Sequence, residues 1–98
     1  AQRLYRKMLR LDSTYYDAYF QLGWIKQFSQ QELDSAMHFY SEVLEIEPKH
    51  IESLHNMGLI YEDKKDISHA LLSYGQVLKY NPEFQLTLDR VAVLKKLR

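Results

Sequence analysis

The chain has 98 residues, of which 46% are apolar and 27% charged, a balance typical of a folded rather than a disordered chain. Its 13 basic and 13 acidic residues cancel, which removes the electrostatic reason to expect nucleic acid or an anionic membrane as a partner. It contains no cysteine, so disulfides, thiolate metal sites and cysteine nucleophiles are excluded.

The first two predicted helices cover residues 1–11 and about 14–28, separated by polar residues that can cap the second helix. Gly23 lies inside the second helix, where a glycine costs about 1 kcal/mol relative to alanine. We therefore expect a neighbouring helix to approach Gly23 closely. Apolar residues at helical spacing define one face of each helix: Leu4, Met8 and Leu11 in the first, and Tyr15, Ala18, Tyr19, Leu22 and Ile25 in the second.

The third and fourth predicted helices cover about residues 29–46 and 48–63. Ser29, followed three residues later by Glu32, fits a capping box, in which the serine hydroxyl and the glutamate carboxylate accept from amides at the helix start. Pro48 opens the fourth helix.

The fifth predicted helix follows the polar turn at residues 64–66, with Asp66 as its N-cap, and passes through Leu78. The sixth covers about residues 83–97. Asn81 and Pro82 predict its start, the asparagine as cap and the proline at the first helical position, where a missing amide hydrogen does no harm. Its apolar residues are Leu88, Val91, Ala92 and Leu94.

A set of residues recurs at a constant displacement of 34 positions, which predicts an array of helical hairpins, each packed on the next. The same alignment makes residues 1–11 the second helix of a truncated repeat and the last helix a first helix without its partner. The predicted division is 1–13, 14–47, 48–81 and 82–98. The recurring residues are Ala36, Tyr40, Val43, Leu44 and Pro48, repeated as Ala70, Tyr74, Val77, Leu78 and Pro82.

This pattern resembles the tetratricopeptide repeat, which has an aromatic residue or leucine, then Leu-Gly, Tyr, Ala, an aromatic residue, Ala and Pro at fixed offsets. The resemblance implies an all-α fold, a right-handed α-solenoid of antiparallel helical hairpins. The matching residues are Tyr19, Leu22, Gly23, Ala36, Tyr40, Val43 and Pro48 in the first full repeat, and Leu54, Met57, Gly58, Tyr61, Ala70, Tyr74, Val77 and Pro82 in the second.

The sequence departs from that pattern in three ways. The step from glycine to alanine is 13 residues in the first repeat and 12 in the second, so one residue is inserted at the first hairpin's turn. Lys26 stands where the pattern has tyrosine, and we expect Phe28 to turn in and replace it. Neither turn contains the usual glycine, so a non-glycine residue is expected to adopt a left-handed conformation at a cost of about 1 kcal/mol.

No catalytic constellation is present, so an enzyme, a cofactor and a metal are not predicted. Glu52 and His55 share one helical face and could begin a metal site, but no second pair accompanies them, and ordinary polar residues are the preferred interpretation. His38, His50 and His69 lack the spacing of metal ligands.

The resemblance also implies which residues line a concave, partner-binding groove. Phe20 and Trp24 would anchor an apolar side chain and Asn56 would hold a peptide main chain; the alternative is that the two rings pack on the preceding helix near Tyr5 or Met8. The predicted groove residues are Phe20, Gln21, Trp24, His55, Asn56, Leu59, Asp89 and Arg90.

The predicted function is non-catalytic protein–protein interaction within a larger scaffold or adaptor. One alternative is a purely structural segment that stacks on other repeats or self-associates through its terminal helices, and another is the regulatory repeat region of an enzyme. Binding of chaperone tails is disfavoured, because only Asn56 and Arg90 match the family's five-residue carboxylate clamp and both of its lysines are missing. Without a signal peptide or an apolar run of about 18 residues, we expect an intracellular, cytoplasmic setting and no membrane insertion.

Overall fold

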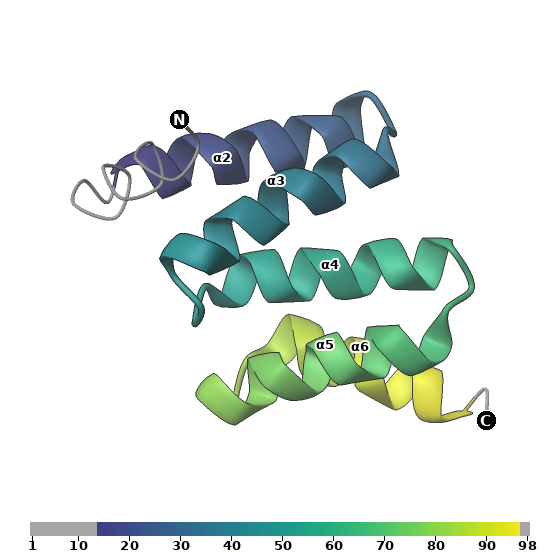
Figure 1. Ribbon diagram of the computed structural model, residues 1–98. Helices are drawn as coiled ribbons and strands as arrows, with labels where there is room; N and C mark the ends of the chain where they lie inside the picture. Colours follow the sequence, from purple (N-terminus) through teal and green to yellow (C-terminus); the bar gives the residue numbers. More distant parts are fainter. Residues whose placement is uncertain (1–13, 97–98) are drawn as a thin grey trace. The chain divides into compact units, whose positions relative to one another are not determined.

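The computed structural model describes residues 14–96, which are helical apart from short turns (Figure 1). The chain divides into two compact units, Ala1–His50 and Ile51–Arg98, here the N-terminal and C-terminal units. The all-α class is confirmed, whereas the predicted helix at residues 1–11 lies outside the described residues. The α-helices are α2 (Thr14–Trp24), α3 (Leu33–Ile46), α4 (Ile51–Asp63), α5 (Ile67–Tyr80) and α6 (Gln85–Lys96), and a π-helical turn, Ile25–Ser29, follows α2.

In the N-terminal unit, α2 and α3 form an antiparallel hairpin, the first hairpin (Figure 1). Three residues of α3 are completely buried: Ala36, Tyr40 and Val43. A Cβ atom on Gly23 would lie only 2.7 Å from Cε1 of Tyr40, closer than a van der Waals contact allows. The expected close approach at Gly23 is therefore confirmed, and the tyrosine ring is what approaches.

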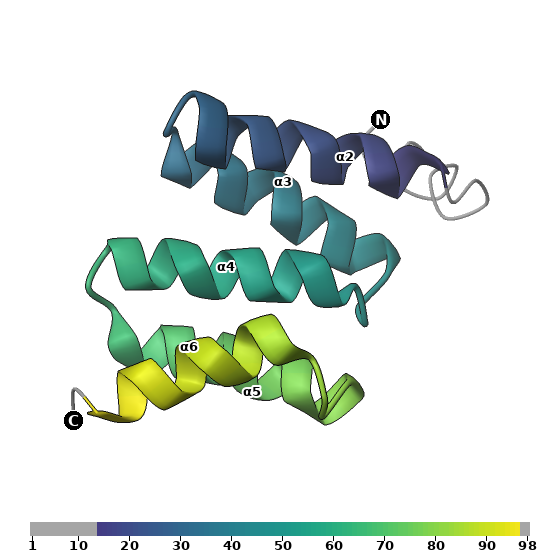
Figure 2. The same ribbon diagram turned by 180° about the vertical axis from the view of Figure 1, so that it is seen from behind.

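In the C-terminal unit, α4 and α5 form the second hairpin, and α6 packs on α5, as Figure 2 shows from behind. Gly58 takes the role of Gly23, because a Cβ atom there would collide with the Tyr74 ring. One core cluster consists of Ala70, Tyr74 and Leu94, with Leu59, Tyr61, Ile67, Leu71 and Val91 packed around them.

The residue inserted in the first hairpin widens the end of α2 into the π-helical turn. The amide of Gln30 donates to the carbonyl of Ile25, five residues earlier, at 3.0 Å. The bond that closes the first hairpin, from Glu32 N to Lys26 O, spans six residues, whereas its equivalent in the second hairpin, from Asp66 N to Tyr61 O, spans five. A π-helical turn accommodates one extra residue without lengthening the loop.

The predicted capping box is wrong. Ser29 belongs to the π-helical turn, α3 begins only at Leu33, and the N-cap Glu32 makes no side-chain cap hydrogen bond. The Glu32 carboxylate instead accepts from Lys26 Nζ at 2.9 Å, and Gln30 Oε1 accepts from the same ammonium at 2.9 Å. The lysine side chain thus joins the widened turn to the residues just before α3.

Phe28 does not replace the missing tyrosine, contrary to expectation, because its side chain is 46% exposed. The widened turn instead buries Gln27, whose Oε1 accepts a hydrogen bond from Tyr40 Oη at 2.7 Å. An amide therefore occupies the inward position beside Tyr40.

The left-handed residues expected in the two turns are present. Gln31 has a φ of 55° and Lys65 a φ of 64°, and each immediately precedes the N-cap of the next helix, Glu32 or Asp66. The N-cap role of Asp66 is confirmed, since its carboxylate accepts from His69 N at 3.2 Å.

The starts predicted for α4 and α6 are wrong by a few residues. Pro48 and Pro82 lie in short turns ahead of the helices, and those turns are closed by bonds from His50 N to Glu47 O and from Phe84 N to Asn81 O. Asn81 is the C-cap of α5, and its Oδ1 accepts from Glu83 N at 3.3 Å. The asparagine and proline therefore end one helix rather than begin the next.

Candidate interaction surfaces

The end of α2 carries a hollow of about 370 Å³, which we term the α2 hollow. Trp24 on its edge is 49% exposed, and its ring centroid lies 5.1 Å from that of Phe28, one turn further along the chain. Within the described part of the chain, the residues that line the α2 hollow are Phe20, Gln21, Trp24 and Ile25.

Phe20 forms a fixed wall of the α2 hollow. Its ring is half-buried, 5.8 Å from the ring of Tyr40 and 5.0 Å from that of His50, between centroids. The ring of Tyr16 also packs against His50, at 5.4 Å between centroids. The alternative packing of Phe20 and Trp24 near Tyr5 or Met8 involves residues outside those described.

The apolar side predicted for α2 is more open than expected. Ala18, Leu22 and Ile25 are all exposed, Ile25 by 41%. Its equivalent in the second hairpin, Ile60, is completely buried. Apolar surface that is covered in one repeat and open in another is typical of an interaction site.

In the C-terminal unit, two of the predicted groove residues are buried. His55 and Asn56 have less than a tenth of their surface exposed. The Nδ1 atom of His55 lies 2.7 Å from Thr87 Oγ1 of α6, a buried hydrogen bond, and its ring packs against those of Tyr74 and Phe84. His55 therefore binds α6 to α4 rather than facing a ligand.

The suggested metal pair does not form. Glu52 is exposed while His55 is buried against Thr87. Over residues 14–96, no three His, Asp or Glu side chains gather closely enough to hold a metal ion.

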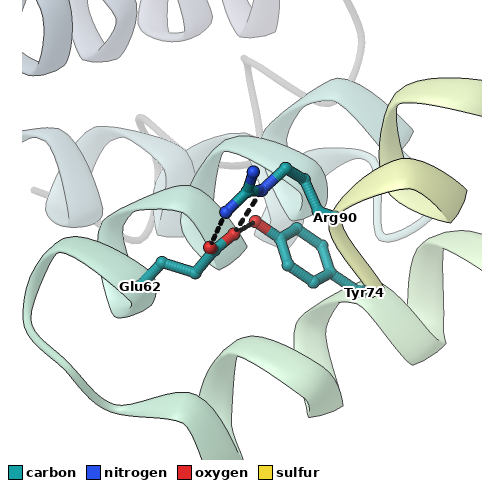
Figure 3. Close-up of polar contacts among 3 residues, drawn as sticks. All are labelled: Glu62, Tyr74 and Arg90. Atoms are coloured by element: carbon teal, nitrogen blue, oxygen red, sulfur yellow. Dashed lines mark hydrogen bonds and ion pairs between the residues drawn. The ribbon is translucent and has the colours of Figure 1, made fainter. Parts of the chain in front are cut away.

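Arg90 is bound by Glu62, as Figure 3 shows. The guanidinium donates from Nε to Glu62 Oε2 at 3.0 Å and from a terminal nitrogen to Oε1, and the Tyr74 hydroxyl donates to Oε2. The Glu62 side chain is 11% exposed and that of Arg90 38%. Three helices are joined at this point, since Glu62 lies on α4, Tyr74 on α5 and Arg90 on α6.

The electrostatics of this cluster follow from burial and pairing. Burial alone would raise the pKa of Glu62, but hydrogen bonds from Arg90 and Tyr74 hold it below its ordinary value of 4.5. Burial and then the nearby Glu62 carboxylate raise the pKa of the Tyr74 hydroxyl. Burial lowers the pKa of His55 from its ordinary value of 6.5, with Glu62 opposing that shift and Arg90 adding to it. At neutral pH the cluster therefore consists of one ion pair and two neutral rings.

Leu59 and Asp89 complete the predicted groove residues. Leu59 is half-buried against the core of the C-terminal unit, and Asp89 is exposed, with its carboxylate accepting from Gln85 Nε2 at 2.7 Å. The structure thus gathers Phe20, Gln21 and Trp24 around the α2 hollow, and it ties His55 and Arg90 into contacts between helices.

Two residues at or beside the α2 hollow were not among the predicted groove residues. Ile25 was assigned to the apolar face of its helix, and Phe28 to the site of the missing tyrosine. For Phe28 the signal was the 13-residue spacing, since an inserted residue rotates the residues next to it. Ile25 precedes the insertion and keeps its correspondence to Ile60, so the spacing held no signal for it.

Comparison with known proteins identifies the class of protein. Residues 16–50 and 51–84 match the family described as tetratricopeptide repeat, so the chain belongs to that family. The hairpins described above are its repeats, and such repeats generally mediate protein–protein interaction.

Among individual proteins, the chain is similar to the uncharacterized protein ycf37 of Pyropia yezoensis, with 35% identity over 83 residues, which is 83% of this chain and 46% of that protein. The ycf37 protein of Guillardia theta is 33% identical over 61 residues, 62% of this chain and 34% of that protein. The crystal structure of MamA superposes with a TM-score of 0.67 and 29% identity, covering 76% of this chain and 43% of that one. The chain therefore spans less than half the length of these relatives.

None of the helices within residues 14–96 combines the length and the apolar character needed to cross a membrane.

Proposed function

We propose that this chain is a non-catalytic interaction module of a larger scaffold or adaptor protein, and that it binds a peptide or helix of a partner protein at the α2 hollow. The observation that carries the proposal is the half-exposed Trp24 beside Phe20, Ile25 and Phe28. An isolated exposed tryptophan would need no explanation, but Trp24 lies at the edge of a hollow whose aromatic wall, Phe20, is rigid.

The chemistry of the α2 hollow favours an apolar anchor. Phe20 is held by Tyr40 and His50, so one wall is already positioned before a ligand arrives. A tryptophan that becomes buried on binding is a frequent hot spot of protein interfaces, because it covers much apolar area and orders few torsions. A leucine, isoleucine or phenylalanine of the partner is the side chain that fits a hollow of this size and lining.

The test compares Trp24→Ala with Leu72→Ala in affinity capture from cell extract, followed by titration of each captured partner. Leu72 is an exposed leucine of α5 and serves as the matched control. We expect Trp24→Ala to weaken binding of a direct partner by about 2 kcal/mol and Leu72→Ala to leave it unchanged. Equal binding by both variants, with helicity matched by circular dichroism, would place recognition elsewhere and refute the proposal.

A second candidate function is structural stacking on another repeat. The exposure of Leu22 and Ile25, against the complete burial of Ile60, favours it, because the same face is covered in the second hairpin. Sedimentation of wild type and Ile25→Glu at several concentrations separates the two functions. Self-association that Ile25→Glu abolishes supports stacking, and a monomer at every concentration leaves the partner-binding role.

A further inference from the structure

One charged side chain of α2 has no partner. Asp17 is exposed, and among the described residues it makes no hydrogen bond or ion pair. The charge of Lys26, beyond the other end of α2, is compensated by the Glu32 carboxylate at 2.9 Å. Asp17 and Lys26 are the only charged residues between positions 14 and 29. The uncompensated charge along this helix is therefore negative.

Asp17 lies on the same face of α2 as the hollow. Asp17, Gln21 and Trp24 are separated by four and then three residues, which aligns them along the helix. At about 1.5 Å per residue, Asp17 lies about 6 Å from Gln21 and about 10 Å from Trp24 along the helix axis. Gln21 and Trp24 both line the α2 hollow. A ligand anchored in the hollow can therefore reach the Asp17 carboxylate with a second side chain.

The unit that carries the α2 hollow favours a positively charged ligand. Residues 14–50 contain six acidic and two basic side chains, a formal net charge of −4, whereas residues 51–96 contain six of each and are neutral. The half-exposed ring of Trp24 adds to this preference, because the face of an indole attracts a lysine or arginine. An apolar hollow on an acidic unit is complementary to a basic segment with an apolar anchor.

We infer that the segment bound at the α2 hollow is a basic helix of the partner protein, in which an apolar anchor enters the hollow and a lysine or arginine one turn away pairs with Asp17. Residues four apart in a helix are separated by about 6 Å along its axis, which matches the step from Asp17 to Gln21. This inference rests on the proposed function and deepens it by stating the chemistry of the partner. Asp17 is then a specificity-determining residue, because it selects the charge that flanks the anchor.

The test uses three synthetic peptides of equal length, each acetylated, amidated and centred on one leucine. The basic peptide is AKAAALAAAKA, with a lysine one turn before and one turn after the leucine, so that either chain direction presents a lysine to Asp17. The neutral peptide AQAAALAAAQA and the acidic peptide AEAAALAAAEA differ from it only at these two positions. Binding is measured by NMR titration of the α2 amides and of the indole N–H of Trp24, the only tryptophan in the chain.

We expect wild type to bind the basic peptide about two- to fivefold more tightly than the neutral one, as exposed charge pairs allow, and the acidic peptide more weakly than both. Asp17→Asn should remove most of this preference and leave binding of the neutral peptide unchanged. Asp63→Asn is the matched control, since it makes the same change in charge at an exposed residue of the C-terminal unit. The preference should persist in that control and diminish in about 1 M salt, which screens exposed charges.

Equal binding of the basic and neutral peptides by wild type would overturn the inference, and so would a preference as large in Asp17→Asn as in wild type. If the peptides nevertheless lose binding in Trp24→Ala, the proposed function stands without the inference. The competing occupant is the chain's own segment at residues 1–11, which carries four basic residues and no acidic one. If that segment filled the hollow, no peptide would shift the Trp24 signal, and the inference and the proposed function would fail together.

Discussion

Tyr40 and Tyr74 are the largest completely buried side chains in the described part of the chain, and each lies against a glycine of the preceding helix. Gly23 and Gly58 are thus required by packing. Gly75 differs, because a Cβ atom there would meet nothing within 4 Å. The same residue type therefore serves close approach at two positions and has no packing role at the third.

We expect Gly58→Ala to destabilise the protein by about 1–3 kcal/mol, because the buried Tyr74 ring is held by Glu62 and cannot move away. Gly75→Ala is the matched control. It should stabilise the protein by about 0.5–1 kcal/mol, since alanine restricts the unfolded chain and meets no obstacle in α5. Urea unfolding measures the change in stability of both variants. A stabilising effect of Gly58→Ala would show that the Tyr74 ring moves to make room for the added methyl group.

Residue-level prediction from the sequence succeeded where a residue type has one strong physical reason and failed where contact partners decide. A glycine destabilises the interior of a helix, so its presence there indicates a site with no room for a side chain. The close approach at Gly23 was therefore predictable. Arg90 was predicted as a ligand contact, but its pairing with Glu62, 28 residues away, depends on how α4 and α6 lie against each other. Helical spacing contains no information about that distance.

At the scale of elements, both hairpin turns use a lysine or glutamine where a glycine would be unstrained. Lys65 and Gln31 adopt positive φ angles immediately before an N-cap. The turns form all the same because the backbone bonds from Asp66 N to Tyr61 O and from Glu32 N to Lys26 O close them.

We expect Lys65→Gly to stabilise the protein by about 1 kcal/mol, because glycine adopts the left-handed conformation without steric cost. Lys64→Gly changes the neighbouring residue, which has no positive φ and continues the helical bonding through its amide to Ile60 O. That variant should lose about 0.5–1 kcal/mol. Thermal melts followed by circular dichroism compare the two, and equal shifts would contradict a role for φ.

Element boundaries were predicted best where one cap residue acts alone. Asp66 begins α5 as expected. The Asn81-Pro82 pair was misassigned, because an asparagine can end a helix or begin one, and only the bond from its own amide to Val77 O shows which. The prediction of Ser29 as a cap was wrong for another reason, because Ser29 belongs to the π-helical turn that follows α2.

At the scale of the whole molecule, the formal net charge is +0, yet the C-terminal unit contains a buried polar cluster whose protonation affects stability. His55 and Glu62 both have pKa values below their ordinary ones. Each therefore binds protons less readily in the folded than in the unfolded chain, so acid favours unfolding.

The free energy of unfolding should fall in two stages as the pH is lowered. The contribution of His55 is complete above pH 6.5 and is lost below it, as the unfolded imidazole takes up a proton that the folded one resists. The contribution of Glu62 is lost only below pH 4.5. Denaturant unfolding across this range should show the first stage in wild type and in His38→Gln, an exposed control, but not in His55→Gln. A first stage that survives in His55→Gln would assign it to another group.

The family was predictable from the sequence because the positions that repeat every 34 residues are the ones that pack helices together. The partner was not, because positions outside this repeating set are free to differ between repeats. Phe20 and Trp24 correspond to His55 and Leu59 of the second hairpin, an aromatic pair in one repeat and a buried imidazole with an aliphatic residue in the other. No periodicity relates these residues, so recognition has to be determined from the three-dimensional surface.

The π-helical turn at Ile25–Ser29 also bears on how this chain is aligned with its relatives. Gap placement usually assumes that insertions and deletions fall in loops. Here the additional residue lies within the π-helical end of a helix, between Lys26 and Glu32. The left-handed residue and the N-cap that follow have the same spacing to Ala36 as their counterparts in the second hairpin have to Ala70. An alignment that opens its gap ahead of Gln27 would pair Gln27 with Tyr61 instead of Glu62, its counterpart as acceptor for the buried tyrosine hydroxyl. Homology modelling and the transfer of site residues within this family should therefore allow indels inside helix ends.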